Sequence, residues 1–157
     1  MIRLFVASDS HGEYSALQAF ARIAKREKAH AVCHLGDFAS DAEMLREMLG
    51  GIPLYSVRGN CDSQGAAPKE RVEHFGACSV LLCHGHAYSV KSGTRELAEA
   101  AAEMGAHLAL FGHTHTSLER YQNGVFLINP GALCGGRFAI VEIDEDGTPF
   151  ASFEDVR

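Results

Sequence analysis

Short apolar runs recur along the chain, and each ends in polar or glycine residues. Apolar runs of this length bounded by glycine are typical of buried strands. The runs cover Ile2–Ala7, Ala31–Leu35, Leu54–Val57, Val80–Cys83, Leu108–Phe111 and Val125–Ile128. We therefore predict six buried strands, each followed by a polar loop.

Helical patterns fill three of the intervals between these runs. Apolar residues recur near helical spacing within Tyr14–Lys28, Asp41–Leu49 and Thr94–Met104. Asp41 or Ser40 is suited to cap the start of the second helix, and Gly105 is suited to end the third. Strands that alternate with helices predict an α/β fold with a partly parallel sheet.

After residue 116 the helical patterns stop and antiparallel strands are predicted. These strands cover Ser117–Gln122, Val125–Ile128, Phe138–Ile143 and Pro149–Phe153. Asn123-Gly124 lies between the first two and is a strong hairpin signal. No repeat, low-complexity tract or linker divides the sequence, so we predict a single domain over residues 1–157.

Composition and charge narrow the possible partners. The net charge is −6, and the Lys and Arg residues are scattered without any run. A surface for long nucleic acid would be basic, so we expect none. The five cysteines are odd in number and include no Cys-x-x-Cys, which favours a reducing compartment. No apolar stretch reaches membrane-spanning length, so we expect a cytoplasmic protein without a membrane partner.

The polar residues that follow the strands carry the chemistry. In open α/β sheets, ligands bind beyond the carboxyl ends of the strands. The side chains expected there are Asp9, His11, Asp37, Asn60, His84, His86, His113 and His115. Carboxylate, imidazole and amide donors suit Mn, Fe, Zn, Ni or Co better than Ca or Mg. We expect two divalent ions, with manganese first and nickel, zinc, iron or cobalt as alternatives.

The spacing of these residues supports a site for two ions. Asp9 and His11 are two positions apart, so in an extended segment they share a face and can chelate one ion. His113 and His115 have the same spacing, and one could reach each of two ions about 3.5–4 Å apart. Asp37 has two carboxylate oxygens and is the natural bridge between the ions.

Each motif also has a simpler explanation when it is taken alone. Asp9 or Ser10 could cap the following helix, and Gly36-Asp37 is a common turn. Asn60 could adopt a left-handed turn conformation. The paired histidines have no comparable packing role, and the ordered set favours a metal site. We assign the remaining histidines to packing or to element ends, namely His30, His34, His74 and His107.

The ordered motifs resemble those of the calcineurin-like metallophosphoesterase superfamily. The motifs are Asp9-Ser-His11, Gly36-Asp37, Gly59-Asn60-Cys61-Asp62, His84-Gly-His86 and Gly112-His113-Thr-His115. The short length and the Gly-Asn-Cys-Asp variant are similar to its branch of small YfcE-like phosphodiesterases. The resemblance covers residues 1–135 and implies a four-layer α/β/β/α sandwich, in which helices flank two mixed sheets.

The resemblance also implies a ligand set and a reaction. The first ion would be held by Asp9, His11, Asp37 and His115. The second ion would be held by Asp37, Asn60, His84 and His113. A metal-bridging hydroxide would attack the phosphorus of a small phosphodiester substrate. Asn60 would also bind the substrate, and Arg58 beside it could neutralise a substrate oxygen.

One position departs from the family pattern. Many members have a histidine that assists the leaving group where this chain has Cys61, and a thiol is a weaker donor. His86 could replace it as the general acid or could support a neighbouring ligand. Asp62 is expected to orient a ligand or cap a turn. Specificity is expected from segments 64–76, 87–94 and 133–137, which carry no recognisable motif.

A non-catalytic role on the same fold is the main alternative. The retromer vacuolar sorting protein resembles this branch and works as an interaction scaffold. A scaffold has no need of a complete ligand set, whereas all seven ligand positions here hold the expected residue type. The sequence therefore favours an enzyme, and it is also compatible with a homo-oligomer.

Overall fold

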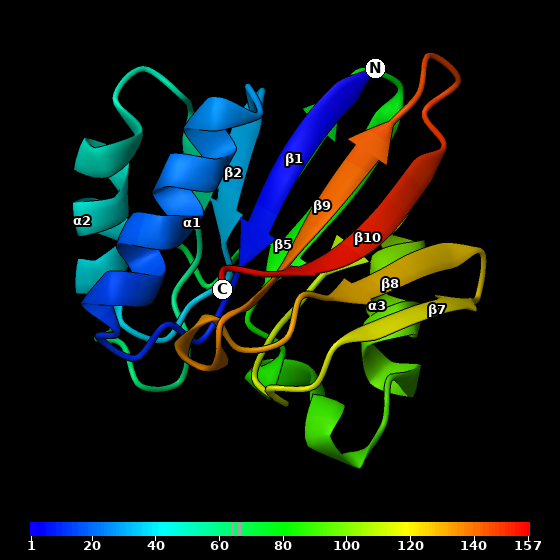
Figure 1. Ribbon diagram of the computed structural model, residues 1–157. Coiled ribbons are helices and arrows are strands. Elements are labelled where there is room, and N and C mark those ends of the chain that lie inside the picture. Colours follow the sequence, from blue (N-terminus) through cyan, green and yellow to red (C-terminus); the bar gives the residue numbers. More distant parts are fainter. Residues whose placement is uncertain (64, 66) are drawn as a thin grey trace.

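The computed structural model describes residues 1–63, 65 and 67–157 (Figure 1). Its strands are β1 (Ile2–Ala7), β2 (Ala31–His34), β3 (Leu54–Ser56), β4 (Glu70–Phe75), β5 (Cys78–Cys83), β6 (Leu108–Leu110), β7 (Leu118–Gln122), β8 (Val125–Asn129), β9 (Arg137–Ile143) and β10 (Pro149–Asp155). Its helices are α1 (Tyr14–Arg26), α2 (Ala39–Leu49) and α3 (Arg95–Glu103). Short 3-10 turns are η1 (His86–Tyr88), η2 (Val90–Ser92) and η3 (Leu133–Gly135). None of the helices in the described part of the chain has the length and apolar character needed to cross a membrane.

The strands form two mixed sheets of five strands each. The first has the order β10-β9-β1-β2-β3, and the second has the order β4-β5-β6-β8-β7. In the first sheet β1, β2 and β3 are parallel, while β9 runs antiparallel to β1. In the second, β5, β6 and β8 are parallel, and β4 and β7 pair antiparallel at the edges. Each sheet therefore has three parallel strands whose carboxyl ends lie at one edge.

Alternating side chains of the strands build two kinds of core. On β1, Leu4 and Val6 pack between the two sheets, whereas Phe5 and Ala7 pack under α1 and α2. Helix α3 covers the outer face of the second sheet through Leu97 and its neighbours. Figure 1 shows α1 and α2 on one side and α3 on the other. The predicted four-layer α/β/β/α sandwich is confirmed.

Three phenylalanines join the helical layer to the first sheet. Phe5 of β1, Phe20 of α1 and Phe138 of β9 are fully buried, with ring centroids 5.2–6.3 Å apart. Aromatic pairs at these separations stabilise a core beyond their buried area alone. This cluster holds α1 against the strand that leads into Asp9.

Strand β4 was not predicted from the sequence. Its residues Glu70–Phe75 are mostly polar, and half-buried and exposed positions alternate along it. It is an edge strand that pairs only with β5, so it needs few apolar side chains. Part of segment 64–76, from which we expected substrate specificity, thus forms a strand. Gln64 and Ala66 of this segment lie outside the described residues.

The predicted cap of α2 was wrong. The helix begins at Ala39. Its N-cap residue is Phe38, whose side chain makes no capping hydrogen bond. Asp62 Oδ1 instead accepts a hydrogen bond from the Ala39 N–H at 2.6 Å, and Asp41 Oδ2 accepts one from the Gly12 N–H at 2.7 Å. Free N–H groups at a helix start can be satisfied from another loop, and here the loops lie close enough to do so.

The aromatic cluster generates a stability prediction. Phe138→Ala should lower the free energy of unfolding by about 3–5 kcal/mol, because it leaves a cavity between α1 and the sheet. Phe150→Ala is the matched control, since Phe150 lies on the neighbouring strand and is 55% exposed; it should change stability by about 0.5 kcal/mol or less. Urea unfolding monitored by circular dichroism measures both, and equal losses would contradict the assigned core.

Candidate metal centre

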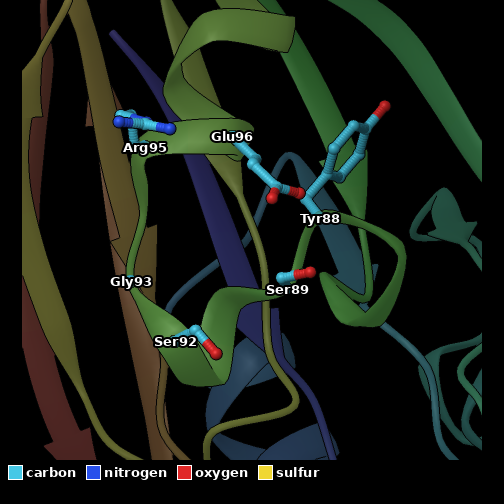
Figure 2. A pocket seen from close by; sticks show the side chains of 6 residues that line it. All are labelled: Tyr88, Ser89, Ser92, Gly93, Arg95 and Glu96. Carbon is cyan, nitrogen blue, oxygen red and sulfur yellow. The ribbon is translucent and has the colours of Figure 1, made fainter.

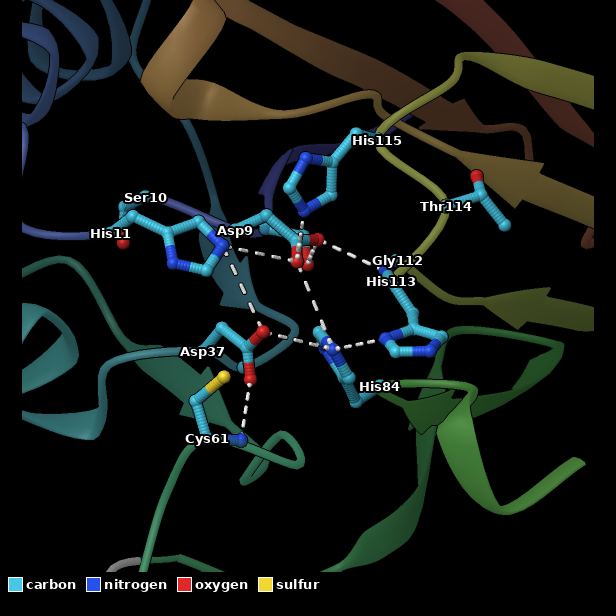
Figure 3. Close-up of polar contacts among 12 residues, drawn as sticks. Asp9, Ser10, His11, Asp37, Cys61, His84, Gly112, His113, Thr114 and His115 are labelled. Atoms are coloured by element: carbon cyan, nitrogen blue, oxygen red, sulfur yellow. Dashed lines mark hydrogen bonds and ion pairs between the residues drawn. The ribbon is translucent and has the colours of Figure 1, made fainter. Parts of the chain in front are cut away.

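The loops that follow β1, β2, β5 and β6 meet at one end of the two sheets. The Asp9 N–H donates to the Gly36 carbonyl at 3.0 Å, and the Gly112 N–H donates to the His84 carbonyl at 2.9 Å. These backbone hydrogen bonds join loops that are far apart in the sequence. Figure 3 shows the side chains of the four loops pointing toward one another.

Asp9 lies at the centre of this cluster and is fully buried. Its Oδ2 accepts hydrogen bonds from Ser8 Oγ at 2.6 Å and from the His113 N–H at 3.0 Å. Its Oδ1 lies 3.1 Å from His115 Nε2 and 3.7 Å from both His11 Nε2 and His84 Nε2. One carboxylate oxygen is therefore fixed by the protein, while the other faces three imidazoles.

Asp37 has a similar arrangement from the opposite side. Its Oδ1 accepts a hydrogen bond from the Cys61 N–H at 3.0 Å. Its Oδ2 lies 3.4 Å from His84 Nε2 and 3.8 Å from His11 Nε2. Both carboxylates thus lie between His11 and His84, and the bridging role of Asp37 stays a prediction.

His84 is held in one tautomer by its surroundings. The Nδ1–H donates to the Leu35 carbonyl at 2.7 Å, which leaves the Nε2 lone pair facing the two aspartates. His113 Nδ1 lies 3.2 Å from the same Nε2 atom. A ring nitrogen held by a backbone carbonyl behind a free Nε2 is the usual environment of a metal-binding histidine.

The spacing of the donor atoms fits divalent ions. Two groups of donor atoms lie within 4.8 Å of one another, and the groups share Asp9: one adds His11 and His115, and the other adds Asp37 and His84. Two donors bound to one ion at about 2.0–2.2 Å lie no more than about 4.4 Å apart, and the carboxylate-to-imidazole distances of 3.1–3.8 Å are within this limit. His11 Nε2 is buried without a hydrogen-bond partner among the described residues, which a bound cation would satisfy.

Charges in the cluster shift the pKa values of its members. Burial alone would raise the pKa of the Asp37 carboxyl, but the neighbouring His84 imidazole and the hydrogen bond from the Cys61 N–H outweigh it and lower the pKa. Burial would lower the pKa of His84, whereas the Asp37 and Asp9 carboxylates raise it, with a net upward direction. The same negative charges would attract a divalent cation.

The backbone of the cluster adopts conformations that non-glycine residues rarely take. Five of the seven predicted ligands have φ values between 45° and 72°, namely Asp9, His11, Asp37, His113 and His115. Each such residue costs on the order of 1–3 kcal/mol, and strained residues cluster at functional sites. The shared strain indicates that the directions of these side chains serve a function.

Two glycines let the loops approach the carboxylates. A Cβ at Gly59 would overlap Asp37 Oδ1, and a Cβ at Gly112 would overlap Ser8 Oγ. The Gly59 N–H also donates to Asp62 Oδ2 at 2.7 Å, so Asp62 caps the turn at Gly59, which is one of the two roles predicted for it. Gly59 before Asn60 and Gly112 before His113 are thus packing requirements.

Two supporting residues were not recognised in the sequence. His34, assigned there to strand packing, is fully buried with its Nε2 2.9 Å from Ser10 Oγ, and burial lowers its pKa. Asn129 Nδ2 donates to the Gly112 carbonyl and to Thr114 Oγ1, both at 3.0 Å, and so supports the loop of His113. Asn129 follows an apolar run, as the predicted ligands do, and this position in the sequence could have identified it as a site residue.

The remaining predicted site residues lie around the cluster. Asn60 is exposed, with its Nδ2 3.8 Å from Cys61 Sγ. Arg58 is half-buried and donates from its guanidinium to the Ala67 carbonyl at 3.3 Å. The His86 ring centroid lies 5.5 Å from that of His84, and its Nδ1 is buried without a partner among the described residues. Six of the seven predicted ligands are therefore in mutual contact, and Asn60 lies beside them.

A hollow of about 290 Å³ lies on the segment that follows His86 (Figure 2). Its walls are Tyr88, Ser89, Ser92, Gly93, Arg95 and Glu96. Tyr88 is fixed there by a hydrogen bond from its hydroxyl to Glu70 Oε1 at 2.6 Å. The hollow contains none of the predicted ligands, so the chemistry is assigned to the cluster and not to this hollow.

Comparison with known proteins identifies the family of the chain. The sequence model of the calcineurin-like phosphoesterase superfamily domain matches residues 2–146. The chain belongs to the calcineurin-like phosphoesterase superfamily, which confirms the family predicted from the motifs. Dependence on divalent metals is a property of this family.

Several relatives illustrate the range of the family. The chain is 34% identical over 134 residues to the probable metallophosphoesterase YsnB of Bacillus subtilis, covering 84% of this chain and 75% of that protein. It is 24% identical over 159 residues to the phosphodiesterase YfcE of Escherichia coli, covering 85% and 80%. It is also 29% identical over 133 residues to vacuolar protein sorting-associated protein 29 of Schizosaccharomyces pombe, covering 83% and 70%.

A solved structure shares the whole architecture. A conserved protein of Streptococcus pneumoniae, described as a predicted phosphoesterase, superposes with a TM-score of 0.81 at 26% identity. The match covers 99% of this chain and 90% of that protein.

The close approach at Gly59 generates a prediction on metal binding. Gly59→Ala should weaken Mn²⁺ binding about 10- to 100-fold, because the added methyl group displaces Asp37. Gly51→Ala is the matched control, since a Cβ there meets no atom within 4 Å. Isothermal titration calorimetry of both variants measures the affinity. Unchanged binding by Gly59→Ala would contradict the placement of Asp37 at the metal centre.

Proposed function

We propose that this protein is a divalent-metal-dependent phosphodiesterase that acts on small phosphodiesters at a two-metal centre. The proposed ligands are Asp9, His11, Asp37, Asn60, His84, His113 and His115. The observation that carries the proposal is the pair of buried carboxylates whose free oxygens lie 3.1–3.8 Å from imidazole nitrogens. Mixed oxygen and nitrogen donors without a thiolate favour manganese, with nickel, zinc, iron or cobalt as alternatives.

Two bound ions would supply Lewis-acid stabilisation of phosphoryl charge and a hydroxide nucleophile at neutral pH. The chain itself would contribute position and charge. Asp9 and Asp37 fix the centre through their hydrogen-bonded oxygens and neutralise only part of the charge of two dications. A local cationic site would then attract a phosphate ester to a protein whose net charge is −6.

Asn60 and Arg58 are suited to orient the substrate. Asn60 is exposed in the loop after β3, and its amide would donate a hydrogen bond to an incoming phosphoryl oxygen. The Arg58 guanidinium is anchored on the Ala67 carbonyl, so its direction is already restricted before a substrate binds. Prepositioned donors lose less conformational entropy on binding than free ones.

His86 is the better candidate to assist the leaving group. Its ring lies 5.5 Å from the His84 ring and 6.2 Å from the His113 ring, and its Nδ1 has no partner among the described residues. Partial burial and the neighbouring Asp37 carboxylate raise the pKa of the Cys61 thiol, which makes it a poorer acid. We therefore propose that His86, and not Cys61, stabilises the departing oxygen.

The scaffold alternative is supported by the match to vacuolar protein sorting-associated protein 29. A scaffold would make the donor cluster dispensable for function. The strained backbone at five proposed ligands argues for selection on the geometry of the cluster itself. Catalysis is therefore the preferred proposal.

Loss of one central ligand tests the proposed activity. Asp37→Asn and His84→Ala should each lower Mn²⁺-dependent hydrolysis of bis(p-nitrophenyl) phosphate about 100-fold or more, since metal-assisted charge stabilisation amounts to several kcal/mol. Asp146→Asn is the matched control on an exposed turn and should retain full activity. Bound metal is measured in parallel by mass spectrometry. Wild-type activity in both ligand variants would refute the proposed enzyme.

The role of His86 is tested by the leaving group. His86→Gln should slow the release of a poor alkoxide leaving group about 100-fold, while p-nitrophenolate, which needs little protonation, is released nearly as fast as by the wild type. Cys61→Ser should affect both leaving groups by less than about 3-fold. Steady-state kinetics is measured on two methyl phosphodiesters, one with an alkoxide leaving group and one with p-nitrophenolate. The ratio of the two rates is compared between each variant and the wild type. A larger leaving-group dependence in Cys61→Ser would reverse the assignment.

A further inference from the structure

An exposed aromatic ring lies beside the metal centre. Phe38 follows Asp37 directly in the sequence, and its side chain is 39% exposed. Its ring centroid lies 5.3 Å from that of His11, with the planes at 65°. A Cβ at Gly12 would lie 3.6 Å from Phe38 Cε2, so the ring also covers this part of the His11 loop. The ring therefore borders the cluster on the His11 side.

The backbone at Phe38 is strained. Its φ of 73° and ψ of 84° lie in the left-handed region, where a bulky side chain is an outlier. Glycine or asparagine adopts this region more easily. Burial does not explain the choice, because Phe38 is 39% exposed. A strained and exposed aromatic residue next to a reaction site indicates a role in binding.

The start of α2 holds the ring in place. The Phe38 carbonyl accepts a hydrogen bond from the Asp41 N–H at 2.9 Å. The next residue, Ala39, donates its N–H to Asp62 Oδ1 at 2.6 Å. Both bonds fix the peptide group that follows Phe38. A ring fixed before binding stacks on a ligand at low entropic cost.

We propose that Phe38 is a specificity-determining residue that stacks on an aromatic ring of the substrate. The proposal rests on the proposed phosphodiesterase function and names its substrate class as aryl phosphodiesters. The Phe38 ring contacts the ring of His11, a proposed ligand, so a ring attached to a phosphate oxygen would lie near Phe38 when the phosphoryl group is at the metal centre. An alkyl substituent offers no π-face and gains less from this contact.

Ligands that are not hydrolysed separate stacking from catalysis. Phenylphosphonate and methylphosphonate carry the same anionic group and differ only in the ring. Their dissociation constants are measured by isothermal titration calorimetry on the Mn²⁺-loaded protein. The wild type should bind phenylphosphonate about 10-fold more tightly, since stacking on an aromatic side chain is worth about 5- to 100-fold. Phe38→Ala should abolish this preference.

Three further variants complete the design. Phe38→Trp should keep the preference, because it keeps a π-face, and Phe38→Leu should reduce it while keeping apolar bulk. These two variants give the comparison if Phe38→Ala does not fold. Phe150→Ala removes a phenylalanine that is 55% exposed on β10 and should leave the preference unchanged.

The outcomes separate the two proposals. An undiminished preference for phenylphosphonate in Phe38→Ala, or in Phe38→Leu, would overturn stacking and leave the phosphodiesterase proposal intact. An equal loss of affinity for both phosphonates would mean that the ring only holds His11, which also overturns stacking. If the wild type binds neither phosphonate and hydrolyses no phosphodiester, the proposed function fails and this inference fails with it.

Discussion

Two buried carboxylates face the same space, and the rest of the site depends on how their charge is balanced. Asp9 is fully buried and Asp37 is 3% exposed. Ionised groups are expensive to bury without compensation, and like charges close together raise that cost. In this protein a hydroxyl and two backbone N–H groups donate hydrogen bonds to the carboxylates, and three imidazoles surround them. Divalent cations would complete the balance, which explains why acidic residues are tolerated at this depth.

The fold makes this arrangement possible by bringing two sets of parallel strands to one end. The loops after β1 and β2 carry both carboxylates and His11, and the loops after β5 and β6 carry His84, His113 and His115. Five of the seven proposed ligands adopt strained backbone conformations, and Gly59 allows its loop to approach within contact of Asp37. The core between the sheets supplies the stability that offsets this strain.

The sequence predicted the regular elements and the ligand set because both are encoded locally. Apolar runs marked six of the ten strands, and the strand pattern after residue 116 marked three more. Motif order marked Asp9, His11, Asp37, His84, His113 and His115. Strand β4 escaped because an edge strand needs few apolar residues. Phe38 and Asn129 were not predicted as site residues for another reason. Their importance lies in contacts with the loops of His11 and His113, which the sequence does not show. A phenylalanine in isolation is typical of a core position, and only the fold places this one at a site.

The central claim is that Asp9 and Asp37 bind two neighbouring metal ions. A crystal structure of the protein soaked in Mn²⁺, with anomalous diffraction recorded at the manganese edge, tests it directly. The account predicts two anomalous peaks about 3.5–4 Å apart, both within coordination distance of an Asp9 or Asp37 oxygen. A single peak, or peaks that contact neither carboxylate, would contradict it.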